Sequence, residues 1–157
     1  CQIKTMDNKL NDTTMKRIFA ILAVAAASLS VMRADDRPVS FNQLPEAAQS
    51  FISMNFPDEK VSYATKDDDI ILPDFTVVLS NGMKIQFEHD GTTDKLEARS
   101  GIPSEMIPVQ IRDYVKLHYP DAYFVEYDVN RRSYEVKLSN RLELKFNVNF
   151  ILVEIDD

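Results

Sequence analysis

The pattern of hydrophobic and polar residues occurs twice along the chain, first from Leu44 and again from Ile107. Each copy opens with a Leu-Pro or Ile-Pro pair, and apolar residues then recur three and four positions apart, the spacing of one helical face. A Phe-Pro-Asp or Tyr-Pro-Asp triplet, at 56–58 and 119–121, ends each stretch, because proline does not continue a helix. Both features repeat at a constant offset of 63 residues. The sequence therefore predicts two short amphipathic helices at equivalent places of an internal repeat.

Apolar residues at every second position follow each predicted helix, the pattern of strands with one buried face. They are Phe75, Val77, Leu79, Met83, Ile85 and Phe87 in the first copy and Tyr134, Val136, Leu138, Leu142, Leu144 and Phe146 in the second. Flanking strands are expected over 61–66, 92–97, 124–129 and 151–155. We expect an α+β fold of two tandem α-β(4) repeats in one curved, mainly antiparallel sheet of about eight strands. Both helices should pack on one face of that sheet.

The register of each hairpin can be predicted from the residues that meet across it. Placing Leu79 opposite Met83 leaves 80–82 as a three-residue loop, with Gly82 where a left-handed conformation is needed. Arg141 occupies the equivalent place in the second copy, where a residue other than glycine costs about 1 kcal/mol. We therefore expect the second turn to differ in detail from the first.

The same register sets Lys137 opposite Glu143 and Glu135 opposite Lys145, so both cross-strand pairs have opposite charge. A sheet covered by helices on one face leaves its other face in solvent. That face either only solvates the sheet or offers a platform to a protein partner. The predicted partner-binding residues on it are Lys84, Gln86, Glu88, Glu135, Lys137, Glu143 and Lys145.

Residues 15–34 have the features of a secretory signal peptide: basic residues at the start, an apolar run over 18–27 and a small residue at the end. Residues 1–14 are polar and begin with Cys1 rather than Met, so we interpret them as an upstream extension outside the fold. We expect 35–157 to form a single domain made of repeats 41–100 and 101–157. This domain is predicted to be exported to the periplasm and to have no stable membrane span.

Charge and cysteine content narrow the function of residues 35–157. This part has 13 basic and 23 acidic residues, a net charge of 13 − 23 = −10, which disfavours nucleic acid and anionic lipid as partners. It contains no cysteine, which excludes disulfide bonds, a thiol nucleophile and a cysteine-ligated metal.

The Leu-Pro opening, the Phe-Pro-Asp helix end and the Leu-Ser-Asn-Gly hairpin at 79–82 resemble the PepSY-like periplasmic proteins of Gram-negative bacteria. The resemblance extends from Leu44 to Asp157. It implies a fold similar to that of the β-lactamase inhibitor protein, with two helix-plus-four-strand repeats in one sheet. It implies roles in binding or inhibition and offers no catalytic residues. Arg141 and the stretch 147–149, which stands where Asp90-Gly91 lies in the first copy, depart from the family pattern.

Two other groups of residues, the histidines and a run of aspartates, are candidates for catalysis or metal binding, but their patterns support these roles only weakly. His89 and His118 fall at non-equivalent places and have no motif serine near them, so they predict a turn residue and a helix residue rather than a catalytic pair. Asp67, Asp68 and Asp69 attract Ca2+ only if their carboxylates converge, and the alternating loop that would achieve this is missing. We expect no catalytic residue, no metal site and no cofactor.

The leading hypothesis is an exported, non-enzymatic binding module that engages an envelope protein or peptide, with inhibition as one form of that role. Tyr63, Tyr123 and Phe124 would add an aromatic anchor if their strands point them outward. The alternative is a periplasmic protein that binds a small ligand or Ca2+, through a groove between the repeats or the loop 67–69.

Overall fold

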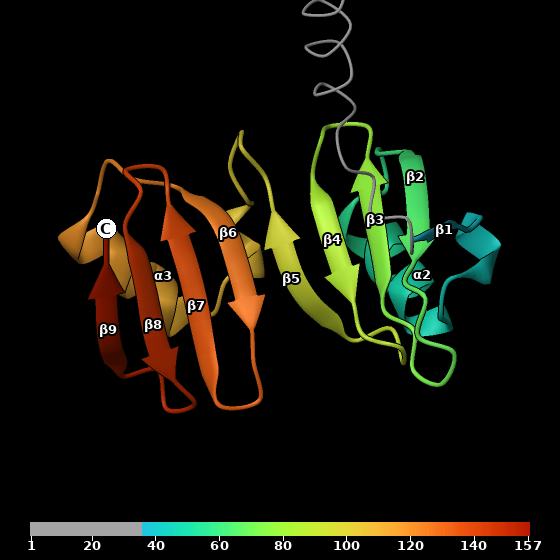
Figure 1. Cartoon of the computed structure of the whole chain (residues 1–157). Coiled ribbons are helices and arrows are strands. Elements are labelled where there is room, and N and C mark those ends of the chain that lie inside the picture. The colour runs from blue at the N-terminus through green and yellow to red at the C-terminus, as the bar shows by residue number, and fades with distance from the viewer. Residues whose placement is uncertain (1–35) are drawn as a thin grey trace, which may run out of the picture. The chain divides into compact units, whose positions relative to one another are not determined.

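The computed structural model describes residues 36–157 (Figure 1), so the predicted signal peptide at 15–34 and the extension at 1–14 lie outside the described residues. The helices of the described part are α2 (Glu46–Asn55) and α3 (Val109–His118). Its strands are β1 (Arg37–Pro38), β2 (Val61–Lys66), β3 (Phe75–Leu79), β4 (Lys84–Phe87), β5 (Thr93–Glu97), β6 (Phe124–Val129), β7 (Ser133–Leu138), β8 (Glu143–Asn147) and β9 (Leu152–Asp156).

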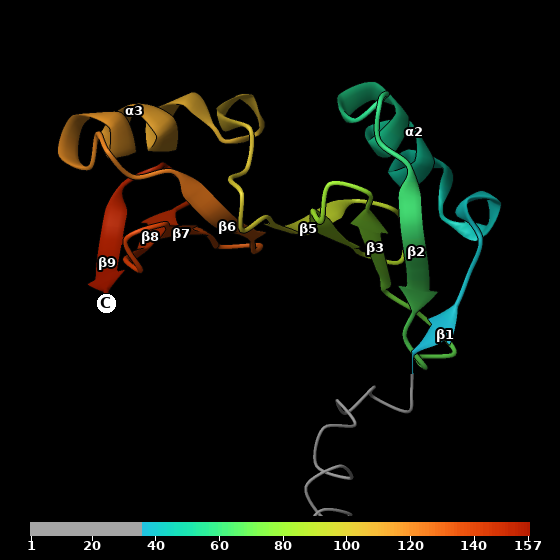
Figure 2. The same ribbon diagram turned by 90° about the horizontal axis from the view of Figure 1, so that it is seen from above.

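The predicted α+β architecture is confirmed. The nine strands form one antiparallel sheet in the order of the chain, and both helices lie on the same face of it (Figure 2). The strand beyond the predicted eight is β1, which pairs Arg37 with Lys66 and Pro38 with Thr65. A strand of two residues is too short to show alternation in the sequence. Neither helix, at ten residues each, has the length and apolar character that crossing a membrane requires.

Each helix packs on the hairpin of its own repeat through equivalent side chains. Ala48 and Ile52 are the buried residues of α2, and Ile111 and Val115 those of α3. Aromatic rings add a contact between the layers in both repeats. Phe51 meets Phe87 edge to face with ring centroids 5.7 Å apart, and Tyr114 meets Phe146 in the same geometry at 5.5 Å. The two copies of the sequence pattern therefore pack helix on hairpin through equivalent residues.

The predicted hairpin registers are confirmed. Lys137 lies opposite Glu143 and Glu135 opposite Lys145, and Leu79 donates its backbone N–H to Met83 O at 2.9 Å. The expected difference between the two turns is wrong. Arg141 adopts a left-handed φ of 77°, close to the 85° of Gly82, and both turns have the same backbone hydrogen bonds. The side chain of Arg141 points into solvent, so only the backbone cost of about 1 kcal/mol opposes this conformation.

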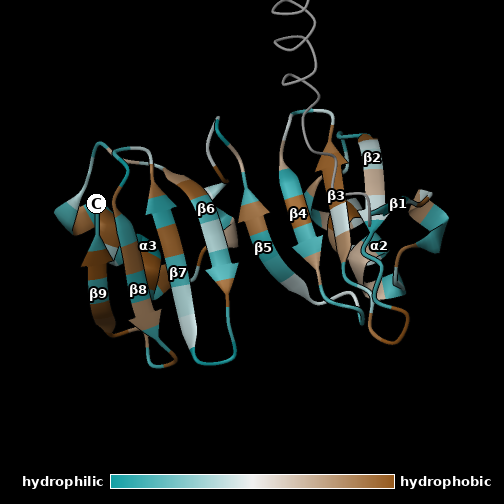
Figure 3. Cartoon of the chain, in the orientation of Figure 1, coloured by the Kyte–Doolittle hydropathy of each residue, from teal (hydrophilic) through white to brown (hydrophobic). Residues whose placement is uncertain are grey.

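The two repeats are joined in one sheet by the β5–β6 pairing. Leu96 lies opposite Tyr127, and both are buried. Beyond the strands, Ala98 N–H donates to Val125 O at 2.9 Å and Ile102 N–H donates to Phe124 O at 2.8 Å. The hydrophobic core thus continues from one repeat into the other across the junction. Figure 3 shows hydrophobic and hydrophilic bands alternating along the strands of both repeats.

Gly91 allows the β4–β5 turn to approach the start of α2. Its φ is +86°, and a Cβ there would lie 2.8 Å from Ala48 N and 2.9 Å from Pro45 Cβ. Gly82 has a similar φ of +85° but open space around it. The residue equivalent to Gly91 in the second repeat is Phe150, which has a φ of 61° and stacks on Tyr134 at 4.9 Å. An aromatic residue therefore occupies this turn position in the second repeat, whereas the close approach of α2 requires glycine in the first.

Replacing each glycine by alanine separates the two effects. Gly82→Ala should lower the free energy of unfolding by about 1 kcal/mol, because only the left-handed backbone opposes it. Gly91→Ala should lower it by on the order of 3 kcal/mol, because the methyl group also pushes α2 away from the sheet. Urea unfolding measures both. Equal losses for the two variants would contradict the close packing of this turn on α2.

Candidate functional site

The face of the sheet opposite the helices has two rows of side chains that run across all strands from β2 to β9. Cross-strand pairing defines the first row as Tyr63, Val78, Lys84, Glu97, Glu126, Lys137, Glu143 and Asp156. The second row is Thr65, Thr76, Gln86, Lys95, Asp128, Glu135, Lys145 and Glu154. We call the surface formed by these sixteen residues the open face. No element of residues 36–157 covers it (Figure 2).

Ion pairs between neighbouring strands order the second-repeat half of the open face. Lys137 Nζ lies 2.7 Å from Glu143 Oε1, and Lys145 Nζ lies 2.7 Å from Glu135 Oε1. These are the two pairs that the sequence predicts. In both lysines the hydrogen bond to the partner carboxylate is the main cause that raises the pKa of the ammonium group. Each lysine therefore remains charged well above neutral pH.

The centre of the open face is a lysine among carboxylates. Lys95 contacts Glu126, lies 3.6 Å from Glu97 Oε1 and 3.9 Å from Asp128 Oδ2, and its side chain is only 22% exposed. Burial acts to lower its pKa, but the hydrogen bond to Glu126 and the surrounding carboxylates outweigh it and raise the pKa. Lys84 extends the network, with Nζ 3.5 Å from Glu97 Oε2.

Six of the seven predicted partner-binding residues lie in the two rows: Lys84, Gln86, Glu135, Lys137, Glu143 and Lys145. Glu88 follows β4 and lies at the end of the sheet beside Asp94 and the β6–β7 turn. The central residues Lys95, Glu97, Glu126 and Asp128 are not among those predicted, because outward positions are predicted only for the two hairpins. Polar residues on both sides of Leu96 and of Tyr127 are the signal in the sequence that points to the same face.

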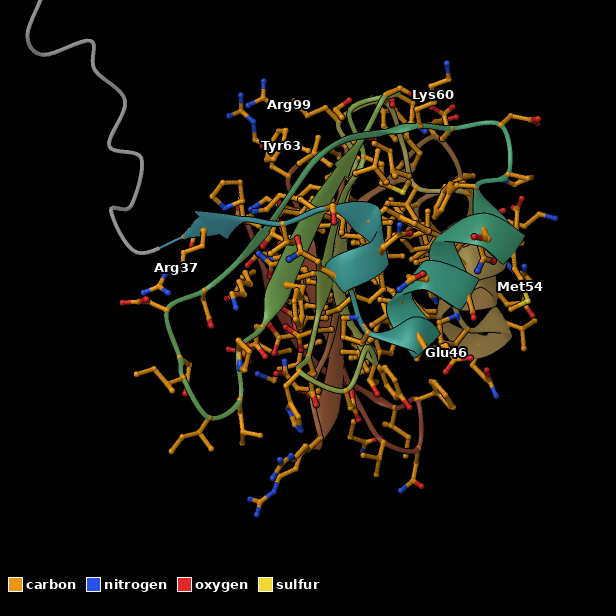
Figure 4. The ribbon with its side chains drawn as sticks, turned by 90° about the vertical axis from the view of Figure 1, so that its right-hand side faces the viewer. Arg37, Glu46, Met54, Lys60, Tyr63 and Arg99 are labelled. Carbon is orange, nitrogen blue, oxygen red and sulfur yellow. The ribbon has the colours of Figure 1, made fainter. Side chains whose placement is uncertain are left out.

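An open hollow of about 400 Å³ lies at the first-repeat end of the open face. Tyr63, Val78, Lys84, Glu97 and Arg99 contribute to its lining. Tyr63 is 58% exposed, and Figure 4 shows it beside Arg99 on the side away from α2. Of the three residues of the predicted aromatic anchor, Phe124 is buried in the core, so it cannot contribute. Tyr123 is 50% exposed, and its ring lies beside Gly101, with Cδ2 3.3 Å from a Cβ built there.

Carboxylates gather where β5 begins, close to the β6–β7 turn. Asp94 is half-buried at a β-bulge of β5, and a hollow of about 410 Å³ lies beside it, lined also by Glu88, Arg131 and Arg132. Burial raises the pKa of Asp94, and the charges of Asp128, Glu88 and Asp74 raise it further. Burial is also the main cause that raises the pKa of Asp128, although Lys95 opposes it. These groups destabilise one another when all are ionised.

The loop 67–69 uses its carboxylates to hold its own backbone. Asp69 Oδ1 accepts N–H groups of Ile71 at 2.9 Å and Leu72 at 3.3 Å, and Asp67 Oδ1 accepts those of Asp69 and Asp74. Asp68 pairs with Arg37 at 2.8 Å. Within residues 36–157 no group of three or more histidine, aspartate or glutamate side chains has an arrangement suited to a metal ion.

The two histidines lie in different surroundings. His118 ends α3 and packs on Tyr114 with ring centroids 4.3 Å apart, whereas His89 is exposed in the β4–β5 turn. Neither makes a side-chain hydrogen bond to a serine among those found in the described residues. Their placement agrees with the helix and turn positions that the sequence predicts.

A protein-family model described as "Putative beta-lactamase-inhibitor-like, PepSY-like" matches residues 31–71 and 73–154. A search of curated proteins finds no match.

Solved structures from Bacteroides are similar to this chain over nearly their full lengths. One, from Bacteroides thetaiotaomicron, is described as a "putative calcium-regulated periplasmic protein"; it is 37% identical, with a TM-score of 0.74, 78% of this chain and 97% of that chain covered. A putative periplasmic protein from Bacteroides vulgatus is 36% identical, with a TM-score of 0.74 and coverage of 80% and 99%. A further one from that species, described as of unknown function, is 29% identical, with a TM-score of 0.72 and coverage of 78% and 99%.

Neutralising Asp94 tests the repulsion at the end of the central strands. A carboxyl group whose pKa is raised by folding stabilises the fold only while it is protonated, and this contribution is lost as the pH rises through the folded pKa. Asp94→Asn should therefore raise the melting temperature at pH 7. The gain should shrink as the pH falls through the raised pKa of Asp94 and should be absent well below pH 3.8, where the carboxyl group is protonated in both states. Thermal melts across pH 3–7 measure it, and a lower melting temperature for the variant at pH 7 would refute the repulsion.

Proposed function

The chain belongs to the PepSY-like family, and from its open face we propose that it is a periplasmic, non-enzymatic module that binds a protein or peptide partner. The observation that carries the proposal is the continuity of the open face. Two rows of side chains cross both repeats, and no described element shields them. The periplasmic descriptions of the similar structures support the location.

The charges of the open face favour a partner with basic groups. The two rows contain four lysines against seven carboxylates. All four lysines already pair with carboxylates of neighbouring strands, so the uncompensated charge is negative. Complementary charge speeds the encounter of two proteins and selects among partners more than it adds affinity. Tyr63, exposed at one end of the face, supplies an aromatic contact of the kind that contributes strongly to binding.

Exchanging the charges of the two confirmed pairs tests this function without breaking the pairs. The variant combines Lys137→Glu, Glu143→Lys, Lys145→Glu and Glu135→Lys, which retains the net charge and both cross-strand pairs. Exposed pairs contribute about 0.2–1 kcal/mol each, so the melting temperature should change by only a few degrees. Affinity for the partner enriched from an envelope extract of the source cell should fall about tenfold or more.

The Arg37–Asp68 pair provides the matched control, because it is exposed and lies outside the two rows. Exchanging it, as Arg37→Asp with Asp68→Arg, should leave capture unchanged. Retention of the partner by the four-residue variant, or equal loss in the control, would place binding elsewhere on the chain.

Calcium binding is the second candidate function, because one similar structure is described as calcium-regulated. The internal hydrogen bonds of the loop 67–69 and the arginines beside Asp94 oppose a cation site at either place. We therefore expect millimolar Ca2+ to leave the melting temperature unchanged, since a cation that binds only the folded state must raise it. A rise that saturates with Ca2+ and is absent with Mg2+ would establish the calcium function instead.

A further inference from the structure

The two ends of the sheet differ in their capacity to accept another strand. At one end β1 has two residues, and one of them is Pro38, which has no N–H to donate. At the other end β9 has five residues, Leu152–Asp156, and contains no proline. Among the described residues β9 pairs only with β8, so its second edge presents unpaired backbone groups. Such an edge is a template for an added strand.

The side chains of β9 show which strand would fit. Glu154 and Asp156 continue the two rows of the open face, opposite Lys145 and Glu143. On the other face Ile155 lies opposite the buried Leu144 and is 48% exposed, because the core ends at this strand. Val153, at the β-bulge, is 57% exposed. One face of the edge is therefore acidic, and the other is an uncovered margin of the hydrophobic core.

We propose that β9 binds an extended peptide segment with alternating basic and apolar residues as a tenth strand of the sheet. Its basic side chains lie beside Glu154 and Asp156, and its apolar side chains extend the core beside Ile155. Backbone hydrogen bonds supply affinity in this mode of recognition, and alternate side chains supply specificity. The bulge at Val153 restricts regular pairing to the end of the strand, Glu154–Asp156.

A second copy of this chain fits the edge poorly. The segment 152–157 contains three acidic residues and no basic residue. Antiparallel pairing of two copies of β9 would bring like charges together on one face, and such pairs are destabilising. The same charges attract a basic segment, so the composition of the strand selects against self-association and in favour of that partner.

Synthetic peptides test the proposal on the chain 36–157 without a known partner. The probe is a labelled nonapeptide of alternating lysine and valine, followed by fluorescence anisotropy at low salt. It should bind saturably, whereas the glutamate–valine peptide of the same length should not. Two further lysine–valine peptides are N-methylated on every second residue, one of them on all lysines and the other on all valines. A strand pairs through only one set of its N–H groups, so one of them should lose binding and the other should retain it. Equal behaviour of the two methylated peptides, or no binding of the parent, overturns the proposal.

Variants of the chain locate the site. Glu154→Lys with Asp156→Lys should weaken binding at least tenfold, because it reverses the charge beside the added strand. Asp36→Lys with Asp58→Lys changes the net charge equally at exposed positions outside β9 and should have a much smaller effect. Equal losses in both variants would mean that the peptide reads only net charge. Formation of a dimer that the β9 variant abolishes would assign the edge to a second copy and overturn the proposal. Glu154 and Asp156 also belong to the open face, so the two methylated peptides, which report backbone pairing, are the measurement that separates the edge of β9 from that face. The open-face charge exchange leaves β9 unchanged, so each proposal can fail alone.

Discussion

Burial of every second strand residue beneath two short helices is the constraint on which the structure depends. The contacts of Phe51 with Phe87 and of Tyr114 with Phe146 fix each helix over its own hairpin. Loss of one buried aromatic ring costs about 3–5 kcal/mol, a large part of the stability of a small domain. A shift of the strand register by one residue would turn Phe87 and Phe146 into solvent. The core therefore also determines which side chains lie on the other face of the sheet. The open face is therefore fixed in composition and register by residues that do not belong to it.

The sequence predicted the elements whose signals are local. Period-two alternation and charge complementarity across Lys137 and Glu143 were sufficient for the hairpin registers, and proline positions were sufficient for the helix ends. The β5–β6 pairing joins strands separated by α3, so no turn in the sequence encodes its register. For that reason the central cluster around Lys95 was missed. The left-handed Arg141 shows that the hairpin register of β7 and β8 outweighs a backbone cost of about 1 kcal/mol.

On the open face every lysine is paired with a carboxylate, and further carboxylates remain without a lysine partner on that face. Pairing of each open-face lysine with carboxylates of adjacent strands limits the freedom of long side chains before any partner arrives, which reduces the entropy lost on binding. The unpaired carboxylates concentrate toward β9, where Glu154 and Asp156 end the two rows. The open face and the edge of β9 thus present the same sign of charge to a partner while using different groups, side chains in one case and backbone in the other.

The most direct test of the central claim is lysine footprinting of the chain with and without an envelope extract of the source cell. The readout is the acetylation rate of each lysine, measured by mass spectrometry. Binding through the open face predicts protection of Lys84, Lys137 and Lys145, with unchanged rates at Lys60 and at Lys116 on α3. Protection of Lys116 while the open-face lysines keep their rates would mean that the partner binds the helical side, which would contradict binding through the open face.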